Sequence, residues 1–141
     1  MPKVFFDTNI LVYQLDKKSP AKREMCRSLV RKTAYDGEAV ISTQVLQEFH
    51  VVATNRLHIA PVVSKSIIHT IENMEIVTIG KELINEAIDA SLQYKLSFWD
   101  ALILVAAESA RCEILYSEDF NDGQIMRNVR VLNPLKDQDK G

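Results

Sequence analysis

The sequence predicts an α/β fold with one central, mainly parallel and twisted sheet, covered by helices on both faces. Short apolar runs typical of buried strands alternate along the chain with longer stretches of helical periodicity. The first run, residues 4–6, is apolar at every position, as in strands whose two faces are both covered. The length of 141 residues suits one domain with its own core. We therefore expect a single domain over residues 1–135 and a polar tail over residues 136–141.

The composition is that of an ordinary globular protein. Hydrophobic residues make up 47% of the chain and charged residues 26%, and the formal net charge is −2. The chain therefore lacks an overall basic balance, although a local basic patch can still bind nucleic acid. We find no signal peptide and no apolar run of membrane length, so we expect a cytoplasmic protein without a membrane partner. Cys26 and Cys112 lack metal-ligand spacing and fit small core residues in a reducing compartment.

In the first half of the chain, each predicted strand leads into helices. A short helix follows the first strand, and a turn over residues 16–20 leads into a second helix that ends near Tyr35, with Met25 and Leu29 facing inward. Residues 39–42 form the second strand. The helix after it runs from Thr43 to about Arg56, and its apolar stripe comprises Val45, Phe49, Val52 and Ala53. A further helix begins at residues 60–61, and its expected inward residues are Val62, Val63, Ile67, Ile68 and Ile71.

The helix over residues 20–35 also carries the strongest basic stripe of the sequence. Its members are Lys22, Arg23, Arg27, Arg31 and Lys32. A charged helix face of this kind is usually a solvated surface, and we favour that interpretation. Contact with a phosphate backbone stays open as the alternative.

The second half of the chain continues the alternation. Residues 75–79 form a third strand, and a helix runs from Lys81 to about Tyr94 with an apolar stripe of Leu83, Ile84, Ala87, Ile88 and Leu92. The helix that begins near Ser97 is apolar nearly all round over residues 101–107, so we expect it in the middle of the fold. Residues 113–116 form a fourth strand before the polar segment 117–123, and residues 129–132 form a last strand.

Four carboxylates stand where this fold would bring them to one edge of the sheet. Asp7 directly follows the first strand, and Asp119 follows the fourth. Glu48 lies one to two turns into the helix after the second strand, and Asp100 lies in the first turn of the apolar helix. The carboxyl ends of parallel strands share one edge, which is where open α/β sheets bind ligands. We therefore expect the four acids to converge there.

Each acid also has a purely structural interpretation. Asp7 can cap the following helix, and Asp100 has capping-box spacing from Ser97. Asp119 lies among turn-forming residues, and Glu48 can reach solvent from the edge of its helix. Four separate explanations at one edge are less economical than one site, so we favour the site.

The ligand chemistry at this edge favours hard metal ions. Clustered carboxylates raise one another's pKa unless a cation neutralises them. Oxygen ligands without His or Cys suit Mg²⁺ or Mn²⁺, and the three histidines, His50, His58 and His69, lack the spacing of zinc ligands. Two such ions roughly 3.5–4 Å apart can activate water and stabilise the leaving oxygen of a phosphodiester. The pattern is therefore typical of metal-assisted phosphodiester hydrolysis.

Four segments of the chain, in order, resemble the PIN-domain nucleases. They are residues 6–13, 47–49, 97–103 and 117–120, which contain the Asp-Thr-Asn, Gln-Glu-Phe, Trp-Asp-Ala and Ser-Glu-Asp motifs. The single-domain length and the motif order look most like the VapC-type toxins of type II toxin–antitoxin systems. The resemblance covers nearly the whole chain. It implies a PIN-like fold and a metal-dependent endoribonuclease that leaves 5′-phosphate and 3′-hydroxyl ends.

The resemblance also implies roles for individual acids. The catalytic, metal-binding set would be Asp7, Glu48, Asp100 and Asp119, with Mg²⁺ or Mn²⁺ as the cofactor. Asp7 and Asp100 would be direct ligands, and Glu48 would act through water or on a second ion. Asp122 stays open as an additional acid that shares or replaces the role of Asp119.

Polar neighbours and partners follow from the same resemblance. Thr8, Asn9 and Ser117 occupy positions where the family places side chains that orient acids or water. Members of the family commonly form homodimers, and a small antitoxin protein blocks them by inserting a segment into the acidic groove. The expected partners are therefore an RNA substrate, a cognate antitoxin and a second copy of the chain.

Other functions stay open at this stage. A DNA-directed or structure-specific nuclease of the same fold would use the same acids, and single- and double-stranded substrates would separate the two. A non-catalytic metal- or RNA-binding module would carry the acids as structural groups. A haloacid-type phosphatase needs a second Asp two residues after the first, where this chain has Asn9. A phosphotransfer receiver needs paired acids before its first helix, which we do not find.

Overall fold

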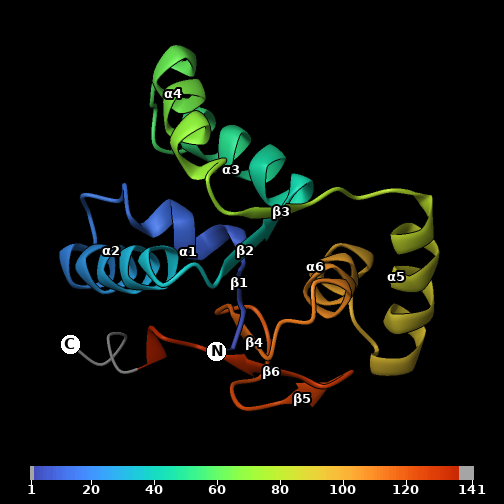
Figure 1. Ribbon diagram of the computed structural model, residues 1–141. Coiled ribbons are helices and arrows are strands. Elements are labelled where there is room, and N and C mark those ends of the chain that lie inside the picture. The colour runs from blue at the N-terminus through green and yellow to red at the C-terminus, as the bar shows by residue number, and fades with distance from the viewer. Residues whose placement is uncertain (1, 137–141) are drawn as a thin grey trace.

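The strands form one sheet in the computed structural model, which describes residues 2–136 (Figure 1). They are β1 (Val4–Phe6), β2 (Ala39–Ser42), β3 (Glu75–Val77), β4 (Ile114–Tyr116), β5 (Ile125–Met126) and β6 (Val129–Leu132). The order across the sheet is β3-β2-β1-β4-β6-β5, and every pair is parallel except β5 with β6. The prediction of a mainly parallel sheet is therefore confirmed.

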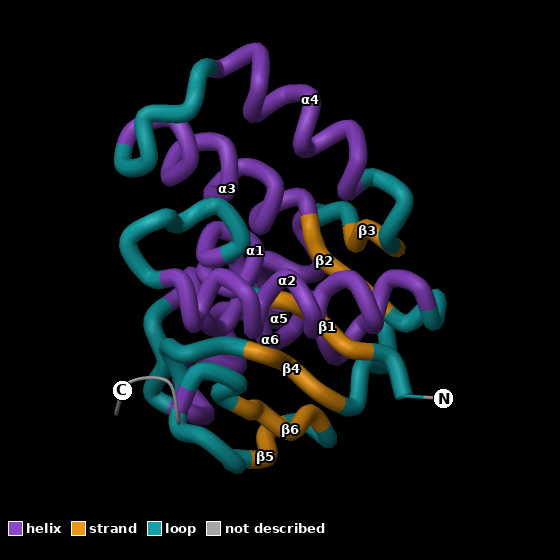
Figure 2. Tube along the Cα trace, turned by 90° about the vertical axis from the view of Figure 1, so that its left-hand side faces the viewer, coloured by secondary structure: helices purple, strands orange, loops and turns teal. Residues whose placement is uncertain are grey.

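Helices cover both faces of this sheet. They are α1 (Thr8–Tyr13), α2 (Pro20–Tyr35), α3 (Thr43–Asn55), α4 (Pro61–Ile71), α5 (Lys81–Tyr94) and α6 (Phe98–Ser109). In Figure 1, α1 and α2 lie on the left of the sheet, α5 and α6 lie on the right, and α3 and α4 extend above β2. Figure 2, seen from the left of Figure 1, shows α2 crossing in front of β1 and β2. None of the helices in residues 2–136 has the length and apolar character that crossing a membrane requires.

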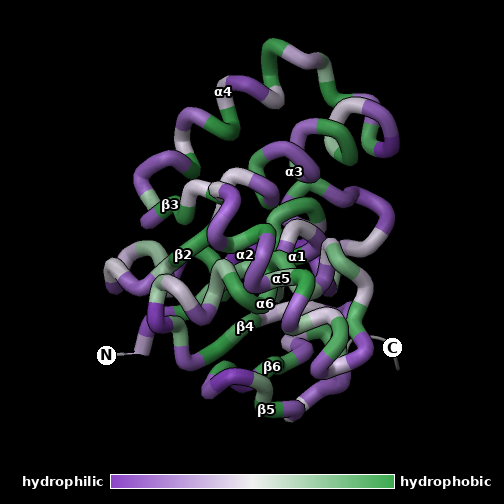
Figure 3. The backbone as a smooth tube through the Cα atoms, turned by 90° about the vertical axis from the view of Figure 1, so that its right-hand side faces the viewer, coloured by the Kyte–Doolittle hydropathy of each residue, from purple (hydrophilic) through white to green (hydrophobic). Residues whose placement is uncertain are grey.

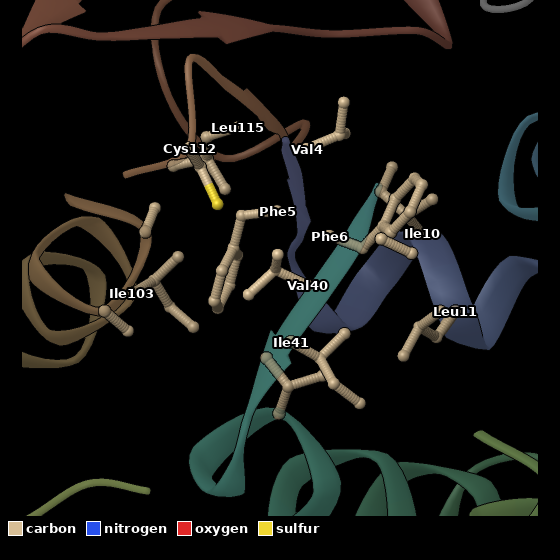
Figure 4. Packing of buried hydrophobic residues seen from close by; sticks show 14 of the residues in the cluster. Val4, Phe5, Phe6, Ile10, Leu11, Val40, Ile41, Ile103, Cys112 and Leu115 are labelled. Atoms are coloured by element: carbon tan, nitrogen blue, oxygen red, sulfur yellow. The ribbon is translucent and has the colours of Figure 1, made fainter. Parts of the chain in front are cut away.

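The core forms around β1, whose residues are all buried. The strand lies between β2 and β4, with Phe5 in register with Val40 and Leu115. Successive side chains of a strand point to opposite faces, so Phe5 lies on the side of Ile103 in α6 and Phe6 on the side of Ile10 in α1 (Figure 4). Residues 101–107 of α6 are buried throughout, as their uniform apolar character predicts.

Several predicted inward faces are wrong. In α2, Met25 is exposed and Leu29 is only partly buried, whereas Cys26, Val30 and Thr33 form the buried stripe. The predicted stripe is one residue out of phase, because many polar residues of α2 leave its apolar face poorly defined. At the start of α4, Val62 and Val63 are exposed, with Val62 at 74%, because α4 packs on α3 at the margin of the fold.

Helix α5 departs from its predicted face for a related reason. Only its two small residues Ala87 and Ala90 are fully buried, because α5 packs against α6 along that edge. Ile84, Ile88 and Leu92, which we expected to face inward, are exposed. Figure 3 shows β2 and β4 as mostly apolar segments, while α4 carries a mixture of apolar and polar residues.

Element boundaries differ from the predictions by small amounts. Helix α1 begins at Thr8, directly after Asp7, and the third strand ends at Val77 rather than at residue 79. The short β5 was not predicted, since a strand of two residues carries no periodicity. The predicted polar tail over residues 136–141 lies outside the described residues, apart from Lys136.

Candidate active site

The acidic pocket, of about 290 Å³, lies at the carboxyl ends of β1 and β4. It is lined by Asp7, Glu48, Asp100 and Asp119, together with Thr8, Asn9, Tyr13, Gln44, Arg56, Trp99 and Glu118, and with apolar side chains of α1, α3 and α6. The four acids singled out in the sequence thus lie around one cavity, at the edge where the strand order places them. A larger cavity, of about 640 Å³ and lined by parts of α1, α2 and α4, contains none of them.

Asp7 is the most buried acid of the pocket, with 4% of its surface exposed. It follows β1 directly and caps α1, because its Oδ1 accepts a hydrogen bond from the Thr8 amide at 2.7 Å. Its Oδ2 accepts a second one from the Ser117 hydroxyl, also at 2.7 Å. Asp7 therefore caps α1 and lines the acidic pocket at the same time.

Burial raises the pKa of Asp7 from 3.8 to about 7. The hydrogen bonds from Ser117 and Thr8 lower the pKa, and the nearby charges of Asp119 and Glu48 raise it further. Within residues 2–136, no basic side chain forms a salt bridge with Asp7. The pocket therefore holds a buried carboxylate that a cation would stabilise in its charged form.

Glu48 reaches the pocket from α3. The Ser42 hydroxyl accepts a hydrogen bond from the Val45 amide at 3.3 Å and so caps the start of this helix. With the helix fixed in this phase, the Glu48 Oε1 accepts a hydrogen bond at 2.8 Å from the Thr8 hydroxyl of α1. Thr8 thus holds Glu48 beside Asp7 in the pocket.

Asp100 lies in the first turn of α6, where its amide donates to the Ser97 hydroxyl at 3.1 Å. The predicted helix start is therefore confirmed. Burial raises the pKa of the Asp100 carboxyl, and the charge of Asp119 adds to the increase. The main-chain group of Asp100 thus serves the cap while its carboxyl lines the pocket.

The structure separates Asp119 from Asp122. Asp119 lines the pocket, accepts a hydrogen bond from the Asn9 side-chain amide at 3.1 Å, and donates its own amide to the Ser117 hydroxyl at 3.1 Å. Asp122 lies outside the pocket lining and accepts hydrogen bonds from the Asn133 amide at 2.8 Å and the Lys136 ammonium at 3.3 Å. The bond from Asn133 is the main reason that the pKa of Asp122 is lowered.

Ser117 connects the two halves of the site. It is fully buried, donates to Asp7 and accepts from the Asp119 amide. It therefore fixes the end of β1 relative to the loop after β4. Within the motif at residues 117–120, the Ser117 hydroxyl therefore positions both Asp7 and Asp119.

Sequence reasoning missed several residues of the pocket wall. Glu118 accepts a hydrogen bond from the Tyr13 hydroxyl at 2.9 Å, and Lys22 lies over the Tyr13 ring at 5.1 Å from its centroid. Glu118 directly precedes Asp119 in the sequence, and this position next to a predicted site residue could have identified it. The positions of Arg56, Trp99 and Gln44 depend on how α3 meets α6, which no local pattern encodes.

Part of the basic stripe of α2 makes contacts within the fold. Arg27 donates its Nε to the Gln14 carbonyl at 2.8 Å and lies within 3.7 Å of Glu24. Arg27 and Arg31 line the larger cavity and not the acidic pocket. Arg31 and Lys32 are exposed, as expected of a solvated face, whereas Lys22, Arg23 and Arg27 are partly buried. Lys22 lies near the pocket rim through its contact with the Tyr13 ring.

The donor set of the pocket fits a hard divalent cation. Two buried acceptor atoms there, the Asn9 Oδ1 and the Gln44 Oε1, have no hydrogen-bond partner in the described part of the chain. Among residues 2–136, no three acid, His or Cys side chains already stand together as a complete metal site. Mg²⁺ needs only one or two carboxylates and completes its coordination with water and substrate phosphate, so this spacing suits it.

The chain matches a known protein family and several solved structures. The family model for the PIN domain matches residues 4–125. No curated protein matches the chain. Several solved structures share its fold, and we describe three of them.

A toxin–antitoxin complex from Klebsiella pneumoniae contains a chain that is 23% identical, with a TM-score of 0.70, and the match covers 94% of this chain and 98% of that one. VapC20 of Mycobacterium tuberculosis, described as a sarcin–ricin loop cleaving toxin, is 16% identical with a TM-score of 0.67, over 84% of this chain and 92% of that one. DNA-bound VapBC from Salmonella typhimurium is 16% identical with a TM-score of 0.69, over 95% of this chain and 99% of that one. The predicted fold is thereby confirmed.

Proposed function

The chain belongs to the PIN domain family, and on that premise we propose that it is a metal-dependent endoribonuclease, the toxin of a toxin–antitoxin pair. The observation that carries the proposal is the acidic pocket, where the buried Asp7 shares one cavity with Glu48, Asp100 and Asp119. The fold that the chain shares with VapC20 and with two toxin–antitoxin complexes supports the same proposal. Purified protein should therefore cleave RNA in Mg²⁺ or Mn²⁺, and EDTA should stop the cleavage.

We assign the metal to the carboxyl groups of Asp7, Asp100 and Asp119, of which one or two would bind the ion directly while water completes its coordination. Bound there, Mg²⁺ or Mn²⁺ would lower the pKa of a water molecule and stabilise the leaving oxygen. The chain's own residues prepare the site for this charge. Ser117 and the Thr8 amide orient Asp7, and Asn9 orients Asp119, so hydrogen bonds hold both carboxyl groups in place.

The proposed products define which bond breaks. A water oxygen bonds to phosphorus while the phosphorus–O3′ bond breaks, which leaves a 5′-phosphate and a 3′-hydroxyl. Glu48 is only half-buried, and Thr8 orients its carboxylate toward the pocket. We assign Glu48 to the attacking water, whose proton it would accept or pass on to solvent.

Arg56 supplies a positive charge at the pocket wall. It caps the end of α3, its residue is exposed, and it is the one basic residue lining the pocket within residues 2–136. No ion pair involves it in that part of the chain, so its guanidinium is available for a phosphate next to the cleaved one.

The Arg56→Ala variant should therefore bind RNA more weakly. We expect KM to rise about 10-fold with little change in kcat, and the salt dependence of binding to fall by about one charge. Cleavage rates measured over a range of salt concentrations test this. The matched control is Arg31→Ala, which removes an exposed arginine outside the acidic pocket and should change neither value. Equal effects of the two substitutions would contradict a local phosphate contact.

The proposed partners follow from the same family premise. We propose that a small antitoxin protein covers the acidic pocket, that the chain forms a homodimer, and that it acts on RNA in the cytoplasm. The fold that it shares with the chains of toxin–antitoxin complexes supports the first of these. Sedimentation of the purified protein, alone and with the candidate antitoxin, tests the first two.

A further inference from the structure

Trp99 is a large aromatic side chain left open to solvent at the wall of the acidic pocket. It is 62% exposed, and it precedes Asp100 in the first turn of α6. It is also the only tryptophan of the sequence. Tryptophan usually buries most of its surface in a folded protein, so an exposed ring beside a candidate active site requires an explanation.

The surroundings of Trp99 hold it in place without covering it. The Phe98 ring packs edge-on against the Trp99 ring, with centroids 5.1 Å apart and an interplanar angle of 73°. The Trp99 carbonyl accepts a hydrogen bond at 3.2 Å from the Gln44 side chain of α3. The Ser97 cap fixes the turn to which Trp99 belongs. The exposed indole is therefore supported on one side, and little ordering remains to be done when a ligand binds.

We propose that Trp99 binds an unpaired nucleobase of the RNA by stacking, next to the phosphate that enters the acidic pocket. This inference rests on the proposed ribonuclease function. A planar apolar ring suits the face of a base, because single-stranded nucleic acids are commonly held by aromatic stacking beside groups that contact the backbone. Here Trp99 supplies the stacking surface, while Arg56 and the acids of the same pocket serve the backbone.

The stacking contact selects unpaired nucleotides. Stacking on a protein ring requires a base that is free of its neighbours in a helix, as in single strands, loops and bulges. The faces of the bases inside a duplex are covered by other bases. The base that stacks on Trp99 is therefore an unpaired one, and stacking alone tolerates any base there.

The single tryptophan makes the contact directly measurable by fluorescence. The test uses the Asp7→Asn variant, which we expect not to cleave, in Mg²⁺ with RNA probes of about ten nucleotides. Uridine and adenosine oligomers should quench the Trp99 emission, and an abasic ribose–phosphate oligomer of the same length and charge should not. A blunt RNA duplex of the same length should quench it far less. Equal quenching by the abasic oligomer would overturn the inference.

Kinetics of the cleaving protein give an independent readout. Trp99→Ala should raise KM for single-stranded RNA about 5- to 100-fold, and Trp99→Phe should restore most of the affinity. The matched control is Tyr35→Ala, which removes an aromatic ring that is 91% exposed and borders the larger cavity instead. Circular dichroism and thermal unfolding establish that each variant is folded, and Trp99→Phe keeps the test valid if the alanine variant is not.

The outcomes separate the inference from the function beneath it. Metal-dependent cleavage with an unchanged KM in both Trp99 variants would overturn the inference and leave the nuclease intact. An unchanged KM together with a changed oligomeric state would make Trp99 a protein contact and overturn the inference as well. Base-dependent quenching by a protein that cleaves no RNA would support the stacking contact and overturn the proposed enzyme.

Discussion

Replacing Asp7 with asparagine should abolish RNA cleavage while the protein stays folded. The substitution removes the buried charge that would hold the metal, and we expect a loss on the order of 1,000-fold in kcat. Asparagine has the same shape, and its side-chain oxygen can still accept the hydrogen bond from the Thr8 amide that caps α1. Initial rates in saturating Mg²⁺, with circular dichroism of the same sample, measure both halves of this expectation.

The Asp7→Asn variant should also be the more stable protein when metal is absent and the pH is high. Burial raises the pKa of Asp7 from 3.8 to about 7, so between these values the folded state holds a proton that the unfolded state has lost. Stability of the unaltered protein therefore falls as the pH rises through this window. Asparagine does not titrate, so its advantage should grow by roughly 2–3 kcal/mol between about pH 5 and about pH 8.

Urea unfolding at both pH values, in EDTA, measures this difference. The matched control is Asp122→Asn, whose carboxyl lies outside the pocket and should show no such gain at high pH. If the unfolding free energies of the unaltered protein and of Asp7→Asn change in parallel between the two pH values, burial does not raise the pKa of Asp7. That result would remove the argument that the pocket needs a cation.

Asp119→Asn and Asp122→Asn should differ by about two orders of magnitude in activity. Asp119 lines the acidic pocket, where its charge raises the pKa values of Asp7 and Asp100, so its loss should lower kcat on the order of 100-fold. Asp122 contacts Asn133 and Lys136 outside the pocket, and its substitution should leave kcat within about twofold.

Cleavage of one RNA by the two variants, side by side, measures the difference. The pair is matched, since each substitution removes one negative charge from the loop after β4. A loss of activity in Asp122→Asn with normal activity in Asp119→Asn would exchange the two roles and contradict the pocket geometry. Thermal unfolding of both variants separates lost chemistry from a loosened loop.

The sequence predicts the parts of this fold in which local pattern and tertiary position agree. Residues 4–6 form the central strand because they are apolar on both faces, and α6 lies in the interior because residues 101–107 are apolar all round. Once strands alternate with helices, parallel topology alone places Asp7 and Asp119 at one edge of the sheet. The convergence of the acids follows from this order.

The remaining features depend on contacts between distant elements. The hydrogen bond from Thr8 to Glu48 joins residues 40 positions apart, and that from Asn9 to Asp119 joins residues 110 apart. The exposure of Trp99 and of Ile88 in α5 depends on which helix edges meet, and hydropathy does not distinguish an exposed apolar side chain from a buried one. The choice between Asp119 and Asp122 similarly required the loop after β4 in three dimensions.

Cleavage of a mixed RNA pool by the purified protein tests the central claim most directly. The reactions contain Mg²⁺ or Mn²⁺, EDTA, or metal together with the Asp100→Asn variant, which keeps the helix cap because its amide still donates to Ser97. The proposed nuclease predicts cleavage that requires metal, disappears with EDTA and in the variant, and leaves 5′-phosphate ends. RNA left intact by unaltered, folded protein in either metal, or cut equally by Asp100→Asn, would contradict it.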